Sequence, residues 1–322
     1  MSDRSLAAAE PAAAPRGSGM RLAIIAAGAL FFAVLPHLLP TYQISVATEV
    51  LIFAVLAMSI DILAGYTGRT PLGHGAIFGV STYVVVYWTT VMGGSPWAGM
   101  LLGVVAATIV GAIFALLAIR TSGVYFLLLT LALGMIVWGV CLRWTSVTGG
   151  ENGLRGSVRP EWLSDHLTFY YVVLVAVAVI TLVMWRFVNS PFGLTLRGIR
   201  DSESRMRSLG YNVPMHLFIA FTASGFFAGI AGAIYAMFND FVSPSTVALA
   251  QSVEGLLMAI TGGIGTLFGA FIGAAAIIGL ENLVSLYTER WQTVLGLMFV
   301  VIMIFAPEGI VGRARMLFRR GR

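Results

Sequence analysis

The chain has 322 residues, of which 58% are hydrophobic and only 10% are charged, so it has too little polar surface to cover a soluble globule. All 19 basic residues are arginine, and a chain without lysine cannot form a phosphate-binding loop, so any ATP hydrolysis must occur on another polypeptide. The net charge of +5 does not indicate nucleic-acid binding, because the arginines cluster between apolar runs instead of lining one aromatic-rich face.

Ten apolar runs follow an alanine- and proline-rich tail at residues 1–19, which we expect to be disordered. Most of the runs are about as long as a helix that crosses a bilayer. They cover residues 22–39, 44–64, 72–87, 97–119, 124–142, 169–187, 215–238, 253–263, 267–286 and 291–305. The pattern predicts an all-α polytopic membrane protein with about ten transmembrane segments, some of them short or glycine-broken, in one permease domain at 20–308.

The arginine positions predict the orientation of the chain. If the N-terminus lies inside and the segments alternate, only Arg143, Arg155, Arg159 and Arg290 fall outside. Positively charged residues favour the cytoplasmic side of a membrane. We therefore expect both termini in the cytoplasm, including a basic tail at 309–322.

Two glycine-rich breaks interrupt the apolar runs, at residues 65–75 and 262–265. A broken helix exposes backbone N–H and C=O groups that can contact a polar solute, and glycine lets backbones come close. We expect these breaks and the segment starting at Glu254 to border the translocation pathway. The residues predicted for the pathway are Tyr66, Gly68, His74, Glu254, Gly262 and Gly265. Tight helix packing or turns at the membrane surface would explain the same glycines.

Four carboxylates, Glu49, Asp61, Glu254 and Glu281, lie in or near apolar runs, where an ionised group is costly and is a functional candidate. Three of them are expected near an interface, which leaves Glu254 as the strongest candidate. A proton-coupled secondary carrier that uses Asp61 and Glu254 is therefore an alternative to an ATP-driven transporter.

The longest predicted outside loop contains the run Thr-Gly-Gly-Glu-Asn-Gly-Leu at residues 148–154. Its Glu151 and Asn152 offer a carboxylate and an amide on flexible backbone, suited to a polar contact at the outer mouth. A solvated turn would explain the same residues.

The inside loop at residues 189–213 has helical apolar spacing among charged residues. This pattern predicts a short amphipathic helix that docks on a partner protein, with Leu196, Ile199 and Met206 as apolar anchors. A helix lying on the lipid surface is the alternative. The residues predicted to couple the chain to an ATPase are Leu196, Arg197, Ile199, Arg200, Asp201, Glu203, Met206 and Gly210.

An enzyme has little support in the sequence. The four histidines are scattered without metal-ligand spacing, and neither a zinc-protease motif nor a nucleophile elbow is present. Cys141 is the single cysteine and is expected to pack in the interior. We therefore expect no catalytic residue, metal site or cofactor.

Several motifs together resemble LivM-type permeases of branched-chain amino acid ABC importers. They are Gly65-Tyr-Thr-Gly with Leu72-Gly-His, Gly123-Val-Tyr-Phe, Thr148-Gly-Gly-Glu-Asn-Gly-Leu, Ser190-Pro-Phe-Gly, Ala231-Gly-Ala-Ile-Tyr, Val242-Ser-Pro, Gly262-Gly-Ile-Gly-Thr and Phe305-Ala-Pro-Glu-Gly. The inside loop adds Arg-Gly-Ile-Arg-Asp-Ser-Glu at residues 197–203 and Leu-Gly at residues 209–210. The similarity covers nearly the whole chain after the tail.

The resemblance implies a LivM/LivH-like permease fold in a bacterial inner membrane. It also implies five kinds of partner: a LivH-like sister permease, two cytoplasmic ABC ATPase subunits, a periplasmic solute-binding protein, a small-molecule solute, and membrane lipid. Branched-chain or other hydrophobic amino acids are the expected solutes. Urea, short amides and aromatic acids are the alternatives within related permeases.

Overall fold

The computed structural model describes residues 40–287 without interruption and, outside that range, residues 32, 35–37, 293, 294, 296, 297, 300, 309 and 310. The chain divides into two compact units, Met1–Pro40 and Thr41–Arg322. In the first unit, the structure describes the 3-10 helix η1 (Leu35–His37). The predicted first and last segments, at 22–39 and 291–305, and both predicted tails lie largely or entirely outside the described residues.

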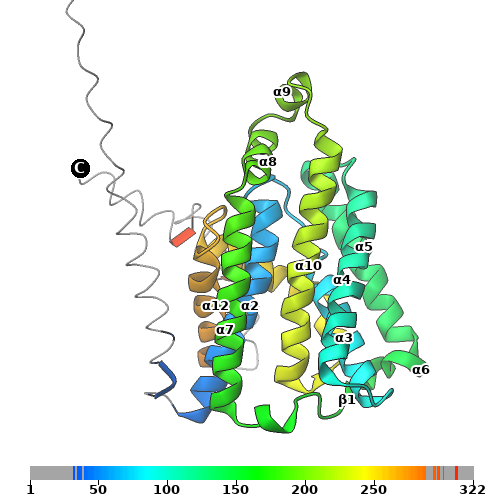
Figure 1. Ribbon diagram of the computed structural model, residues 1–322, viewed down its shortest axis with the longest axis vertical. Coiled ribbons are helices and arrows are strands. Elements are labelled where there is room, and N and C mark those ends of the chain that lie inside the picture. The colour runs from blue at the N-terminus through cyan, green and yellow to red at the C-terminus, as the bar shows by residue number, and fades with distance from the viewer. Residues whose placement is uncertain are drawn as a thin grey trace, which may run out of the picture. The chain divides into compact units, whose positions relative to one another are not determined.

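Eight helices of the second unit coincide with the eight apolar runs predicted between residues 44 and 286 (Figure 1). They are α2 (Thr41–Ala64), α3 (His74–Thr90), α4 (Pro96–Ala118), α5 (Gly123–Arg143), α7 (His166–Val188), α10 (Val213–Asn239), α11 (Leu249–Gly262) and α12 (Gly269–Ser285). Among the described residues, α2, α4, α5, α7 and α10 are long and apolar enough to cross a membrane, and α12 is apolar but shorter. The prediction of an all-α polytopic membrane protein with some short segments is confirmed.

Short elements connect these helices. They are α6 (Thr145–Thr148), η2 (Gly150–Asn152), β1 (Leu154–Arg155), η3 (Glu161–Leu163), α8 (Pro191–Asp201), α9 (Glu203–Ser208), β2 (Phe241–Val242) and η4 (Pro244–Val247). The strands β1 and β2 pair antiparallel, with Leu154 opposite Val242, and the sequence did not predict this pairing. Helices α7 and α10 run between the two ends of the unit. Helices α8 and α9, which connect them, lie at one end, and β1 lies at the other end (Figure 1).

Helix α2 forms the centre of the unit, since every side chain from Val50 to Ala64 is buried. It packs against α7, α10, α11 and α12. A helix that is apolar on all sides is suited to such a fully enclosed position. Helix α5 differs, because it exposes large apolar side chains such as Leu128, Ile136 and Val140, which suit contact with lipid.

Small residues allow α4 and α10 to pack closely. A methyl group added at Gly111 would lie 3.1 Å from the Cα atom of Gly225, and the reverse substitution would be equally tight. One turn further along α10, Gly229 faces Ala107 of α4. Such contacts drive helix association in membranes, where burial of apolar side chains from water contributes little.

We expect Gly225→Leu to destabilise the protein by about 1–3 kcal/mol, because the larger side chain would push α4 away from α10. Thermal unfolding of the purified protein in detergent measures the effect. The matched control is Gly139→Leu in α5, where an added side chain would meet no other atom within 4 Å. Equal unfolding temperatures for the two variants would contradict the proposed importance of the α4–α10 contact.

Candidate functional site

The two glycine breaks meet in the folded chain. A methyl group added at Gly65, just after α2, would lie 2.5 Å from the backbone nitrogen of Gly265, which follows α11. We call this contact region, residues 65–68 and 263–267, the glycine junction. The side-by-side placement of the two breaks requires glycine, because any Cβ atom at Gly65 would overlap the opposing backbone.

Asp61 holds the second break in place. Its carboxylate accepts hydrogen bonds from the backbone N–H groups of Gly265 at 2.6 Å and Leu267 at 3.1 Å. Helix α12 begins two residues later at Gly269, so the carboxylate lies near a helix N-terminus, where backbone charge favours an anion. The interfacial position that the sequence suggested for Asp61 stays a prediction, and within the protein the residue is 2% exposed and accepts both of these hydrogen bonds.

Arg200 reaches the same junction from α8. Its Nη1 donates a hydrogen bond of 2.6 Å to the carbonyl oxygen of Gly65. The aliphatic part of the side chain lies against Gly68, whose φ of +72° is in the left-handed region. A side chain at Gly68 would strain the backbone and would also come within 2.9 Å of the Arg200 Cγ atom.

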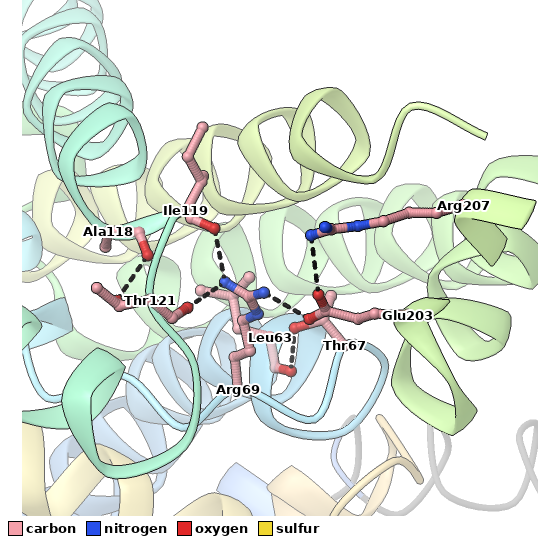
Figure 2. A network of polar contacts seen from close by, with 8 residues as sticks. All are labelled: Leu63, Thr67, Arg69, Ala118, Ile119, Thr121, Glu203 and Arg207. Atoms are coloured by element: carbon pink, nitrogen blue, oxygen red, sulfur yellow. Dashed lines mark hydrogen bonds and ion pairs between the residues drawn. The ribbon is translucent and has the colours of Figure 1, made fainter. Parts of the chain in front are cut away.

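Arg69, in the first glycine break, links the break to α9 and to the connection between α4 and α5 (Figure 2). Its Nη1 donates hydrogen bonds to the carbonyl oxygens of Ile119 at 3.0 Å and Thr121 at 2.5 Å, in the connection between α4 and α5. Its Nη2 forms an ion pair of 2.5 Å with Glu203 of α9. The Arg69 side chain is 6% exposed, so this guanidinium is a buried charge with a carboxylate partner.

The predicted amphipathic helix is in fact two helices. Ser202 separates α8 from α9, and its hydroxyl accepts a hydrogen bond from the Arg205 N–H as an N-cap. Gly210, with a φ of +86°, follows the end of α9. We call residues 189–213 the α8–α9 segment.

The predicted anchors of the α8–α9 segment face the interior of this chain. Leu196, Ile199 and Met206 are 0%, 1% and 9% exposed, so they pack within the permease and are not available to insert into a partner. The physical reason is that the apolar side of the segment covers the ends of the neighbouring helices, α7 and α10. The expectation that these three residues contact a partner therefore needs correction.

The charged residues predicted for coupling differ in their contacts. Glu203 binds Arg69, and the half-exposed Arg200 binds the Gly65 carbonyl oxygen, whereas Asp201 is exposed and pairs only with its neighbour Arg200 among the described residues. Arg197 donates a hydrogen bond to the Val188 carbonyl oxygen, and its guanidinium lies 5.2 Å from the ring centre of Tyr66. Tyr66, predicted for the pathway, thus packs beside the α8–α9 segment.

The remaining pathway residues do not gather at one point. Gly262 and Gly265 lie at the junction end of α11, while Glu254 lies eight residues earlier, about 12 Å along the helix axis. Glu254 accepts a hydrogen bond from Gln251 of the same helix. The structure thus separates Glu254 from the glycine junction.

His74 connects three helices in the interior. Its Nε2 lies 2.6 Å from the Ser224 hydroxyl of α10, and that hydroxyl donates to the Ser59 carbonyl oxygen of α2 at 2.5 Å. The ring is completely buried at the start of α3. These contacts favour a packing role for His74, and its place on the pathway stays a prediction.

Glu151 and Asn152 are exposed on η2, at the end of the bundle opposite α8 and α9 (Figure 1). The following loop is fixed to the end of α10, because Arg159 donates hydrogen bonds to the carbonyl oxygens of Met237 and Phe238. Burial lowers the pKa of Arg159, and the nearby Asp240 opposes that shift. The outer-mouth role of the two exposed residues remains a prediction.

Sequence reasoning did not assign Arg69 to the site. A signal was present, because a lone arginine between Gly68 and Pro71 stands inside an apolar stretch where charge is costly. What the sequence lacked was the position of the partner, since Glu203 lies 134 residues away.

The family described as "Branched-chain amino acid transport system / permease component" matches residues 42–306, which is most of the chain. The chain belongs to this family. It is a transport permease subunit, as its resemblance to LivM-type permeases predicted. No solved structure matches the chain.

Several known permeases are similar to this chain in sequence. The high-affinity branched-chain amino acid transport system permease protein LivM of Salmonella typhimurium is 26% identical over 87% of this chain and 72% of its own length. The corresponding LivH of Escherichia coli is 22% identical over 81% of this chain and 91% of its own length. The autoinducer 2 import system permease protein LsrC of Salmonella paratyphi B is 26% identical over 65% of this chain and 61% of its own length.

We expect Asp61→Asn to lower the free energy of unfolding by about 1–3 kcal/mol, because the amide can accept only one of the two buried N–H groups. Thermal unfolding in detergent measures the change. Asp201→Asn is the matched control, since Asp201 is exposed and should change stability by about 0.5 kcal/mol or less. Unchanged stability of Asp61→Asn would contradict the role assigned to this carboxylate.

Proposed function

We propose that this permease is the transmembrane subunit of an ATP-driven importer for branched-chain or other hydrophobic amino acids in a bacterial inner membrane. The family match over residues 42–306 carries the proposal, supported by relatives whose names specify branched-chain amino acid transport. The name of LsrC specifies autoinducer 2 import, so the family is not confined to amino acids. Urea, short amides and aromatic acids remain alternatives that no contact in the structure favours.

The chain lacks the lysine of a phosphate-binding loop, so the energy of ATP must reach it by contact with other subunits. The proposed assembly contains a LivH-like sister permease, two cytoplasmic ABC ATPase subunits and a periplasmic solute-binding protein. We place the ATPase contact on the α8–α9 segment. With the predicted anchors buried, its exposed large apolar residues are Leu194 and Leu209, which are 68% and 66% exposed, and Tyr211, which is 43% exposed.

The rival proposal, a proton-coupled carrier using Asp61 and Glu254, has weaker support. The Asp61 carboxylate is occupied by two backbone N–H groups, which suits a fixed structural position more than repeated proton release. The two carboxylates also lie at opposite ends of α11. Asp61 binds the break that follows α11, whereas Glu254 lies in the first half of this helix.

We expect Leu194→Asp to weaken ATPase association by about 1–3 kcal/mol, or roughly fivefold to 150-fold, by placing a charge in an apolar contact. The experiment copurifies the ATPase with the reconstituted permease pair and measures ATP-dependent leucine uptake in the presence of the binding protein. Val91→Asp is the control, because Val91 is similarly exposed and follows Thr90, which lies against Gly156 beside β1 at the opposite end of the bundle. Full association and uptake by Leu194→Asp would move the contact elsewhere, and uptake without ATP would reject the importer.

Orientation is tested with single cysteines in a Cys141→Ala background. Glu151→Cys should react with an impermeant thiol reagent added outside intact cells, whereas Ser204→Cys should react only after the membrane is opened. The reason is that both positions are exposed, at opposite ends of the bundle, and the arginine-rich end should lie inside. Labelling of both cysteines from the outside would overturn the proposed topology.

A further inference from the structure

Two arginine side chains join the α8–α9 segment to the region of the glycine junction. One arginine belongs to the first glycine break and the other belongs to α8. Arg69 extends from the first glycine break to Glu203 of α9, and Arg200 extends from α8 to the Gly65 carbonyl oxygen. We propose that these two links are the internal transmission of the permease, which makes the glycine junction move together with the α8–α9 segment. The inference rests on the proposed function, because the force it transmits is supplied by the ATPase.

The Arg69 link joins three segments through one buried side chain. Arg69 belongs to the first break, its guanidinium binds the α4–α5 connection and α9, and its Nε has no hydrogen-bond partner among the described residues (Figure 2). Glu203 is the one carboxylate within ion-pair distance of Arg69 in the part of the chain that the structure describes. A buried charge that loses its counterion is strongly destabilised, so α9 cannot move away from Arg69 without carrying the break along.

The Arg200 link extends the transmission to α12. Arg200 binds the Gly65 carbonyl oxygen, Gly65 touches Gly265, and Asp61 holds the Gly265 and Leu267 N–H groups just before α12. Each step is a direct hydrogen bond or a backbone contact with no room for a side chain between. A displacement of α8 therefore reaches the ends of α2 and α12 through two side chains, those of Arg200 and Asp61, and one backbone contact.

The neighbouring ion pair of Glu203 with Arg207 does not serve the same purpose. It spans one helical turn within α9, its atoms are 3.5 Å apart, and the Arg207 side chain is 63% exposed. An exposed pair of this kind contributes little and connects α9 only with itself.

The test measures leucine uptake per ATP hydrolysed in the reconstituted complex, together with copurification of the ATPase. Arg69→Gln and Glu203→Gln should each lower this ratio by about tenfold while the ATPase stays bound, since each breaks the ion pair that forms the link. The double variant Arg69→Gln/Glu203→Gln should stay as low as the single variants, because it leaves no unpaired charge but does not restore the link, whereas full recovery would trace the single losses to an unpaired charge and overturn this link. Arg120→Gln is the matched control, an exposed arginine on the same α4–α5 connection, and should stay within about twofold of the parent.

Arg200→Gln keeps the inference testable if Arg69→Gln does not fold, because the Arg200 side chain is 44% exposed, whereas that of Arg69 is 6% exposed. It should lower uptake per ATP with the complex intact. Parental ratios for both arginine variants, or for Arg200→Gln alone where Arg69→Gln does not fold, would overturn the transmission and leave the proposed function standing. A parent complex that binds no ATPase would instead reject the proposed function itself.

Discussion

The structure depends on one constraint, which is that backbone polar groups inside a membrane protein must find partners within the protein. A helix that stops before it has crossed the bilayer leaves N–H groups without acceptors, and the cost of each is several kcal/mol in lipid. In the break between α11 and α12, the Asp61 carboxylate is the acceptor for the N–H groups of Gly265 and Leu267. The central helix α2 therefore both fills the core and completes the backbone of a broken neighbour.

The same constraint explains why arginine is used where the breaks meet the α8–α9 segment. Carbonyl oxygens at the ends of α2 and α4 need donors, and a guanidinium offers several in a fixed planar arrangement. Arg200 supplies the Gly65 carbonyl oxygen, and Arg69 supplies those of Ile119 and Thr121. A positive charge brought inside for this purpose then needs an anion, which Glu203 provides.

Burial of the apolar residues of α8 and α9 changes how the permease can receive energy. Because Leu196 and Ile199 pack inside, the segment is part of the permease fold and not a detached arm. A push on its outer face is then carried by a packed body with two polar links beneath it. This arrangement suits a subunit without an ATP site, since coupling requires a stiff connection between the contact surface and the moving helix ends.

The sequence by itself determined the class of protein, the eight apolar helices between residues 44 and 286, and the family, because apolar length and glycine interruptions are local properties of the chain. It also located the α8–α9 segment by its charged, amphipathic pattern. Only the tertiary structure decided which way that segment faces, because an amphipathic pattern reports an apolar side without saying whether the same chain or a partner covers it. The pairs Asp61 with Gly265 and Arg69 with Glu203 were likewise decided by the fold, since each joins residues more than a hundred positions apart whose separate types are compatible with many partners.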